Sequence, residues 1–267
     1  MKTTRRGVFW LFLSLFVAGG ATAESPVLDR IVGTGVLRVG MSGDQPPFNA
    51  TDRSGELIGL EVDLANLLAA AFDVELRLVK KDFPELLGAL DAKEVDIVLS
   101  GMAITAERSR DYTFVGPYVL SGKSILTKSA NVAAAREAGD LDSMDLTLVV
   151  LGNSTSQTFV EKAIPNAEIV TTQNYEQAIQ LVLDDEVDAM VADMPICLIS
   201  VLRYPGKDLV TSSEPLSVEP IGMAVPSNDP QLVNLLQNYL AAFEGTGIMD
   251  ELRKKWMEDG SWIAALP

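Results

Sequence analysis

Histidine is absent from the 267 residues, and cysteine occurs once, as Cys197. The absence of histidine removes the commonest general base at neutral pH and the commonest metal ligand. A single cysteine excludes an internal disulfide, and its apolar neighbours in PICLIS predict a buried, inert thiol. We therefore expect no catalysis that depends on histidine, no metal and no other cofactor.

Basic residues are scarce: 21 lysines and arginines stand against 37 aspartates and glutamates, which gives a formal net charge of −16. Phosphate backbones repel such an acidic chain, so we expect no nucleic acid partner. Aromatic residues make up only 6% of the chain, but apolar residues make up 48%, which is enough to bury a core. The length predicts one large domain or two modest ones.

The clearest targeting signal lies at the N-terminus. Basic residues precede the apolar run Val8–Val17, and the small-residue sequence ATA follows at positions 21–23. This order is typical of a secretory signal peptide, here residues 1–23. The alternative, a membrane anchor, is disfavoured because the run is too short to span a bilayer comfortably. The sequence therefore predicts export to the periplasm and a mature chain that begins near Glu24.

After the signal peptide, strand-like and helix-like segments alternate in two successive halves. The predicted strands are Val36–Met41, Val74–Val79, Val95–Leu99, Leu146–Leu151, Ala167–Val170 and Val187–Val191. The predicted helices are Gly59–Phe72, Phe83–Leu90, 155–163, Tyr175–Leu183, 194–204, Asp229–Phe243 and Met249–Met257. This alternation predicts an α/β fold in which each half is a mostly parallel sheet flanked by helices.

Two extended segments, Ser121–Thr127 and Leu216–Val225, are placed to connect the halves. The sequence therefore predicts two lobes, residues 24–121 with 218–267 and residues 122–217. Because the chain would cross between the lobes twice, we expect a hinge and a ligand cleft between them.

A candidate anion site lies within Val95–Gly122. Ser100 and Gly101 end a predicted strand, Thr105 is a suitable N-cap for a short helix, and Arg108 falls in its first turn. Ligands of open α/β sheets bind at the carboxyl ends of the strands, and a guanidinium offers paired donors to a carboxylate. The alternative is that Arg108 is a solvated surface residue.

The second half adds polar groups at equivalent places. Ser154 and Thr155 begin a predicted helix, and Asp193 follows a strand. All three could instead serve as ordinary helix caps, and Phe83, which could line the cleft, could instead pack in the core. Together with Arg108, these hydroxyls and this carboxylate suit a zwitterion that carries both a carboxylate and an ammonium group.

The stretch SGMAITAERSRDYTFVGPYVLSGKS resembles the bacterial extracellular solute-binding proteins of family 3, which bind polar amino acids in the periplasm for ABC transporters. GLEVDLANLLA at 59–69, GNSTSQTF at 152–159 and VDAMVAD at 187–193 extend the resemblance over 36–256. It implies a two-lobed periplasmic binding fold, an L-amino acid ligand and a membrane permease as partner. We expect a monomer.

The resemblance also implies roles for single residues. Arg108 would clamp the ligand α-carboxylate, assisted by the backbone of Ala103 and Thr155 and by the Thr155 hydroxyl. The Gly101 carbonyl and the Asp193 carboxylate would accept the α-ammonium group.

The residues around the ligand side chain depart from the family pattern. Phe83 would pack on that side chain, but Ser42 stands where several members carry an acidic residue. Gln45 stands where an aromatic ring is frequent, and Ala103 where a hydroxyl is usual. These departures leave the identity of the amino acid open and disfavour a strongly basic ligand such as arginine.

The segments VGMSGDQPPF and AITAERSRDYTFVGPYVLSGK are also similar to cyclohexadienyl dehydratases, which share this fold and eliminate water and carbon dioxide from prephenate or arogenate. That reaction needs a proton donor for the leaving hydroxyl. The resemblance places the donor, a glutamate, where this chain has Gln157, and an amide cannot act as a general acid. Glu161, one turn later, is the remaining candidate acid. We therefore favour binding over catalysis, with a receptor's sensor domain as a third alternative.

Overall fold

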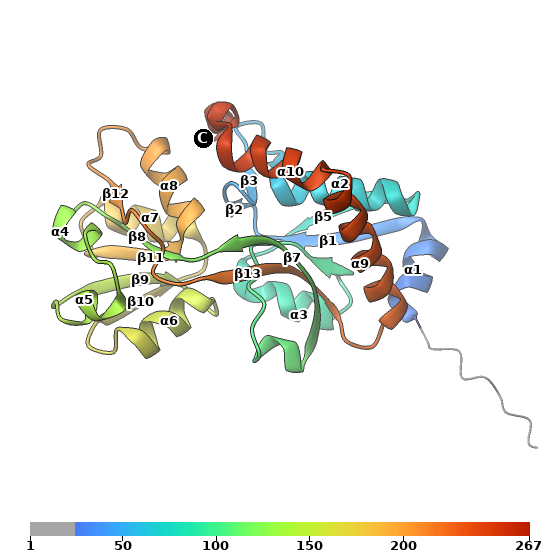
Figure 1. Ribbon diagram of the computed structural model, residues 1–267, viewed down its shortest axis with the longest axis horizontal. Coiled ribbons are helices and arrows are strands. Elements are labelled where there is room, and N and C mark those ends of the chain that lie inside the picture. Colours follow the sequence, from blue (N-terminus) through green and yellow to red (C-terminus); the bar gives the residue numbers. More distant parts are fainter. Residues whose placement is uncertain (1–24) are drawn as a thin grey trace, which may run out of the picture.

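The computed structural model describes residues 25–267 and shows two α/β lobes side by side (Figure 1). Each lobe is built around one five-stranded sheet, so the predicted two-lobed α/β architecture is confirmed. The predicted signal peptide, 1–23, lies outside the described residues. Across residues 25–267, no helix combines the length and the apolar character that a membrane crossing requires.

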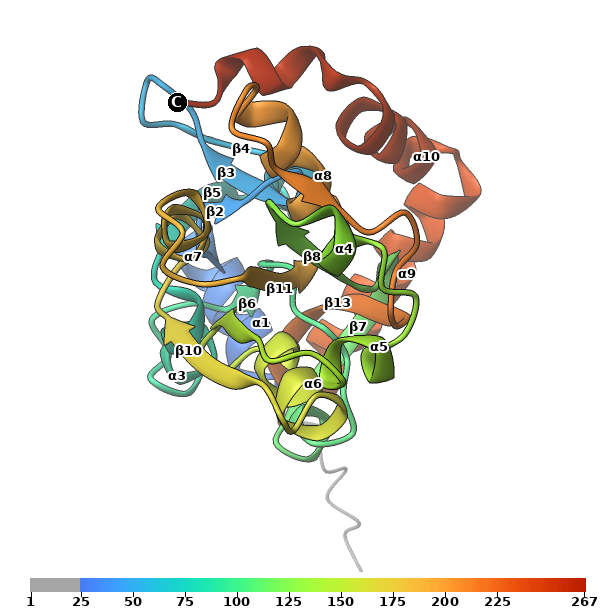
Figure 2. The same cartoon turned by 90° about the vertical axis from the view of Figure 1, so that its left-hand side faces the viewer.

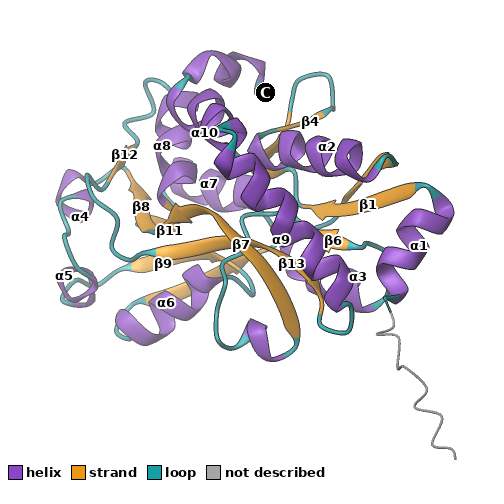
Figure 3. Cartoon of the chain, turned by 45° about the vertical axis from the view of Figure 1, so that its right-hand side comes forward, coloured by secondary structure: helices purple, strands orange, loops and turns teal. Residues whose placement is uncertain are grey.

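The sheet of lobe 1 is mixed. Its strands are β1 (Val36–Met41), β5 (Glu75–Lys80), β6 (Ile97–Val98), β7 (Tyr112–Ser121) and β13 (Glu219–Pro226), in the order β5-β1-β6-β13-β7. The first three are parallel, as β-α-β connections require, whereas β13 runs antiparallel to β6 and β7. The helices of this lobe are α1 (Pro26–Thr34), α2 (Leu60–Phe72), α3 (Leu86–Asp91), α9 (Pro230–Gly245) and α10 (Ile248–Arg253) (Figure 3).

Lobe 2 repeats this plan. Its strands are β8 (Lys123–Thr127), β9 (Thr147–Leu151), β10 (Glu168–Thr172), β11 (Ala189–Asp193) and β12 (Val210–Thr211), in the order β10-β9-β11-β8-β12. Figure 2, with lobe 2 in front, shows β8 beside β11, to which it is antiparallel. The helices are α4 (Ala130–Ala133), α5 (Ala138–Asp142), α6 (Thr155–Ala163), α7 (Tyr175–Leu183) and α8 (Met194–Arg203).

Side-chain caps explain where two helices of lobe 2 begin. Ser154 Oγ accepts a hydrogen bond from Gln157 N at 3.2 Å, and Asn174 Oδ1 accepts one from Gln177 N at 3.0 Å. Each cap satisfies an N–H group that the helix itself cannot bond. Asp193 occupies the same position before α8, but its side chain makes no capping hydrogen bond. The Asp193 carboxylate therefore does not cap α8, and it accepts a hydrogen bond from Lys123 Nζ instead.

Several predicted elements differ in the structure. The helix predicted to begin at Thr105 is a 3₁₀ turn, Arg108–Arg110, although Thr105 Oγ1 does accept a hydrogen bond from Arg108 N at 3.1 Å. The last predicted helix is α10 followed by a π-turn, Lys254–Glu258. The loop after β1 contributes to a small sheet of β2 (Asp44–Gln45), β3 (Asn49–Thr51) and β4 (Leu57–Ile58), which the sequence did not indicate.

The chain crosses between the lobes twice, and the two crossings touch. Leu216 N donates to Lys123 O at 2.7 Å, and Lys123 N donates to Ser217 Oγ at 3.0 Å. A Cβ atom on Gly122 would lie 1.9 Å from the carbonyl oxygen of Ser217, so only glycine permits this approach. We propose that the lobes divide at these crossings, as the sequence predicts, into residues 24–121 with 218–267 and residues 122–217.

The two lobes are closed against each other. Asp44 Oδ2 in lobe 1 accepts a hydrogen bond from Tyr175 N, at the start of α7 in lobe 2, at 2.7 Å. One apolar cluster includes Phe83 of lobe 1 and Tyr175 of lobe 2. At the C-terminal end of the chain, Leu266 shares a second cluster with Ala50 of lobe 1 and Ile199 of lobe 2. Apolar burial therefore contributes to the contact between the lobes.

Candidate functional site

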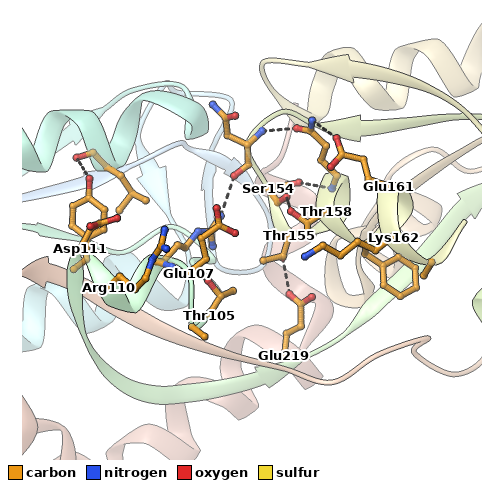
Figure 4. Close-up of a pocket in the computed structure, with 18 residues that line it drawn as sticks. Thr105, Glu107, Arg110, Asp111, Ser154, Thr155, Thr158, Glu161, Lys162 and Glu219 are labelled. Carbon is orange, nitrogen blue, oxygen red and sulfur yellow. Dashed lines mark hydrogen bonds between the residues drawn. The ribbon is translucent and has the colours of Figure 1, made fainter. Parts of the chain in front are cut away.

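A cavity of about 860 Å³ lies between the two lobes (Figure 4). Lobe 1 contributes the 3₁₀ turn with Arg108, lobe 2 contributes the start of α6 with Ser154 and Thr155, and strand β13 contributes Glu219. Both signs of charge line the cavity: Arg108, Arg110 and Lys162 are the cations, and Glu107, Asp111, Glu161 and Glu219 are the anions. A cavity of this kind suits a small ligand with separated positive and negative groups.

Arg108 is held between the lobes by main-chain acceptors. Its Nη1 donates to Ala103 O at 3.0 Å, and its Nη2 donates to Asn153 O in lobe 2 at 3.0 Å. Its guanidinium carbon lies 5.8 Å from the ring centroid of Phe83. Burial lowers the pKa of Arg108 below its ordinary value, and the nearby carboxylates, Glu219 before Asp193, oppose that shift. Three of its five donors are not used by these two bonds and can serve a ligand carboxylate.

A group of buried charges lies next to the cavity. Lys123 Nζ contacts Asp193 Oδ1 at 2.8 Å and Glu219 Oε2 at 3.0 Å. Thr155 Oγ1 donates to the same Glu219 oxygen at 2.7 Å (Figure 4). Burial raises the pKa of Asp193, and the ammonium of Lys123 opposes the shift. In this closed form the Asp193 carboxylate and the Thr155 hydroxyl, both predicted to hold the ligand, are bonded to protein groups.

Ser42 and Gln45 lie in a separate hydrogen-bonded group beneath the strand tips of lobe 1. Gln45 Nε2 donates to Ser42 Oγ at 2.8 Å and to Ser100 Oγ at 3.0 Å, and all three side chains are buried. A Cβ atom on Gly101 would lie 2.4 Å from Gln45 Oε1, and the φ angle of Gly101 is +56°. Glycine is therefore needed at 101 for Gln45 to pack against the main chain.

The Glu61 carboxylate on α2 fixes the main chain at Gly101. It accepts hydrogen bonds from Gly101 N at 2.7 Å, from Asn49 Nδ2 at 2.5 Å and from the hydroxyl of Tyr118. Burial raises the pKa of Glu61, and these donors oppose the shift. The sequence indicated only that Glu61 lies in a helix, because nothing local shows that its side chain points to the Gly101 loop.

The structure brings together only some of the predicted residues. Arg108, Ser154 and Thr155 line the cavity, whereas Asp193 is buried beside it. Phe83 is 6% exposed and packs in the cluster that joins the lobes. The individual ligand contacts therefore stay predictions.

Lys123 and Glu219 are the residues that the sequence did not single out. Each is a lone charged residue at the start of an extended apolar segment, KSILT and EPIGMAV. A charge at such a position is a weak signal, because an edge strand often carries one. Only the register that pairs Lys123 with Asp193 across β8 and β11 shows that the two charges meet.

The position of a possible general acid is occupied by a fixed amide. Gln157 Oε1 accepts a hydrogen bond from Asn153 N at 2.9 Å, and Gln157 Nε2 donates to Glu161 Oε1 at 2.8 Å. Glu161 is exposed on α6 and lines the cavity. Among residues 25–267, no group of three or more side chains is placed to hold a metal ion.

The model of the bacterial extracellular solute-binding proteins, family 3, matches residues 37–259. The chain is 26% identical to the cyclohexadienyl dehydratase of Pseudomonas aeruginosa over 246 residues, which cover 92% of this chain and 91% of the relative. It is also 26% identical to the L-cystine-binding protein TcyJ of Escherichia coli over 234 residues, which cover 88% and 87%.

Solved structures give the same result. The ancestral amino acid-binding protein AncCDT-1, described as a precursor of cyclohexadienyl dehydratase, is 34% identical with a TM-score of 0.78, covering 86% of this chain and 99% of that one. A binding component of an ABC transporter from Wolinella succinogenes, complexed with lysine, is 33% identical with a TM-score of 0.80 and the same coverage. The predicted family is therefore confirmed: this chain belongs to family 3 of the bacterial extracellular solute-binding proteins.

Proposed function

We propose that this protein captures an L-amino acid, or a closely related zwitterion, outside the cytoplasm and delivers it to an ABC transporter. The observation that carries the proposal is the cavity between the lobes, which both the Arg108 guanidinium and the Glu219 carboxylate line. A zwitterion satisfies both groups at once, and a buried charge without a partner is costly.

The relatives support an amino acid as the ligand class. They include proteins named for binding L-cystine, arginine and glutamine, and a solved structure with bound lysine. In our proposal Arg108 clamps the α-carboxylate with help from Ala103, Ser154 and Thr155, and the acidic group around Asp193 accepts the ammonium. Ser42, Gln45 and Phe83 shape the space for the side chain from lobe 1, and the Gly101 carbonyl assists.

Closure of the lobes accounts for capture and delivery. The two crossings form a hinge, and the contact between Arg108 and Asn153 exists only while the lobes are together. Closing excludes water from the cavity, which strengthens each charge pair around the ligand. We propose that a membrane permease recognises the closed form, that the mature chain acts in the periplasm after loss of residues 1–23, and that it works as a monomer.

A thermal-shift screen of the mature protein tests the proposal. The protein is unfolded and refolded to remove bound ligand and is then mixed with the common L-amino acids, D-forms, dicarboxylates, prephenate and arogenate. A ligand at 100 times its dissociation constant stabilises by about 2.7 kcal/mol, a clear shift of the melting temperature. We expect a hit among the L-amino acids. The proposed ligand class would be refuted if only dicarboxylates raised the melting temperature, or if no compound did.

Replacing Arg108 tests the site itself. Arg108→Ala removes the cation that faces the ligand carboxylate and should weaken binding by about 100-fold or more, since the carboxylate is then buried without a partner. Isothermal titration calorimetry measures the loss. Arg110→Ala, which removes another cation of the same cavity wall, is the matched control. Near-normal affinity of Arg108→Ala would show that the ligand binds elsewhere.

The second candidate function is a dehydratase, which the similarity to the Pseudomonas enzyme favours. In that case Glu161 would have to supply the proton, because Gln157 has no acidic proton and its amide is bonded to Asn153 and Glu161. Turnover of prephenate or arogenate, followed by the absorbance of the aromatic product and abolished in Glu161→Gln, would establish the enzyme. Binding without turnover would leave capture as the function.

A further inference from the structure

Residues 260–267, which we call the strap, lie against both lobes. Figure 1 marks the end of the chain above the boundary between the lobes. Leu266 is 2% exposed and shares an apolar cluster with Ala50 of lobe 1 and Ile199 of lobe 2. This side chain is fully buried only while both lobes are in place, so its burial favours the closed form.

The strap is anchored on lobe 1. The ring centroids of Trp262 and Trp256 lie 5.2 Å apart, and Trp256 Nε1 donates to Asp63 Oδ2 on α2 at 2.7 Å. In the loop between β3 and β4, Arg53 N donates to Ala265 O at 2.9 Å. All of these partners belong to lobe 1, so the strap stays with that lobe when the lobes separate.

The strap reaches lobe 2 at α8. Leu266 packs with Ile199, and Arg203 Nε donates to Pro267 O at 3.2 Å. A cavity of about 470 Å³ lies beside these contacts, and residues of both lobes line it together with Leu266 and Pro267. Because this cavity separates facing surfaces of the lobes, the strap bridges the lobes at a place where those surfaces do not pack directly.

We propose that the strap holds the lobes closed, because it stays fixed to lobe 1 and contacts α8 of lobe 2 only in the closed form. These contacts lower the free energy of the closed form alone, so they raise the ratio of closed to open protein before any ligand binds. Burying a leucine side chain that the open form leaves partly exposed changes this ratio by about 10-fold. The strap acts on opening itself, so this role does not depend on which ligand the cleft binds.

The amide of Tyr175 reports opening directly. Its N–H donates to Asp44 Oδ2 across the lobes at 2.7 Å, and it begins α7, where the helix itself supplies no acceptor. Opening exposes this N–H to water, so its hydrogen exchange, followed by NMR on the refolded, ligand-free mature protein, measures the open fraction. The Gln177 amide, which donates to Asn174 Oδ1 within lobe 2 at 3.0 Å, is the internal reference.

Two variants remove the contact between the strap and lobe 2 from opposite sides. A chain that ends at Ala265 lacks Leu266 and Pro267 but keeps the hydrogen bond that anchors the strap to lobe 1. Ile199→Ala truncates the apolar partner on α8. Leu202→Ala, on the same helix but at a side chain that is 61% exposed, is the matched control.

In the shortened chain and in Ile199→Ala, we expect the Tyr175 amide to exchange about 10-fold faster than in the wild type, with exchange of the Gln177 amide unchanged. Leu202→Ala should exchange as the wild type does. The proposed role of the strap is overturned if Tyr175 exchanges within about twofold of the wild-type rate in either variant, or if Leu202→Ala accelerates exchange equally. It is also overturned if Gln177 accelerates together with Tyr175, because lobe 2 would then unfold rather than separate from lobe 1.

Discussion

The buried ion pair of Lys123 and Asp193 allows one stability prediction to be worked through in full. Three variants form a double-mutant cycle: Lys123→Met, Asp193→Asn and the two together. In the wild type the ammonium lies 2.8 Å from the carboxylate, and both side chains are almost entirely buried. Removing one member leaves the other charge buried without that partner, which typically costs about 3–5 kcal/mol, whereas replacing both members with neutral groups is often close to neutral.

Because Glu219 also contacts Lys123, we expect the two single variants to lose different amounts of stability. In Asp193→Asn, Lys123 keeps the Glu219 oxygen at 3.0 Å, so part of its charge stays balanced. In Lys123→Met, both carboxylates lose the ammonium that contacts them directly. We therefore expect the free energy of unfolding to fall by about 3–5 kcal/mol in Lys123→Met and by less in Asp193→Asn.

Thermal and urea unfolding of the ligand-free proteins measure these losses. Because about 1 kcal/mol corresponds to a shift of roughly 2–4 °C for a protein of this size, Lys123→Met should melt roughly 6–20 °C below the wild type. The double variant should melt above Lys123→Met, which is the signature of a coupled pair. Additive losses in the double variant, or a Lys123→Met protein within about 1 kcal/mol of the wild type, would refute the claim that the two charges depend on each other.

Two contacts between the lobes give further predictions. Burial raises the pKa of Asp44 in the closed form, with Glu176 adding to the shift and Lys80 and the bond from Tyr175 N opposing it. The closed form is therefore favoured below the ordinary pKa of this carboxyl and loses that advantage as pH rises through the raised value. Asp44→Asn should bind its ligand more tightly at pH 7 and with a flatter pH dependence by calorimetry; an unchanged slope would contradict this. Leu266→Ala, at a side chain 2% exposed between the lobes, should cost about 2 kcal/mol or more and enlarge the ligand-free protein in X-ray scattering, and unchanged dimensions would count against it.

Local patterns in the sequence predicted what is local in the fold. The helix-like spacing of Gly59–Phe72 predicted α2 almost to the residue, and the apolar run Leu146–Leu151 predicted β9. Ser154 was identified as a candidate cap and does cap α6. In each of these cases the determining contacts lie within one element or one turn, so the residue types alone carry the information.

The charges of the site could not be placed in the same way. Lys123 Nζ contacts the carboxylate of Asp193, seventy residues away in the sequence, and that of Glu219, beside the second crossing. Both contacts depend on strand order and register. The sequence correctly placed Asp193 at a strand tip but could not show that a lysine already occupied one of its oxygens. The docking of Leu266 on both lobes is likewise a long-range contact with no local signal.

Two charged residues of the proposed site lie beside the crossings between the lobes. Lys123 begins β8 and Glu219 begins β13, the two strands that follow the crossings between the lobes. The bond from Thr155 to Glu219 spans the lobes at 2.7 Å, so opening breaks it and returns the carboxylate to water. In the function proposed above, the ligand carboxylate binds Arg108, whose Nη2 reaches Asn153 O of lobe 2 only in the closed form. Because a ligand shifts a conformational equilibrium only through its differential affinity for the two states, this placement converts binding into closure.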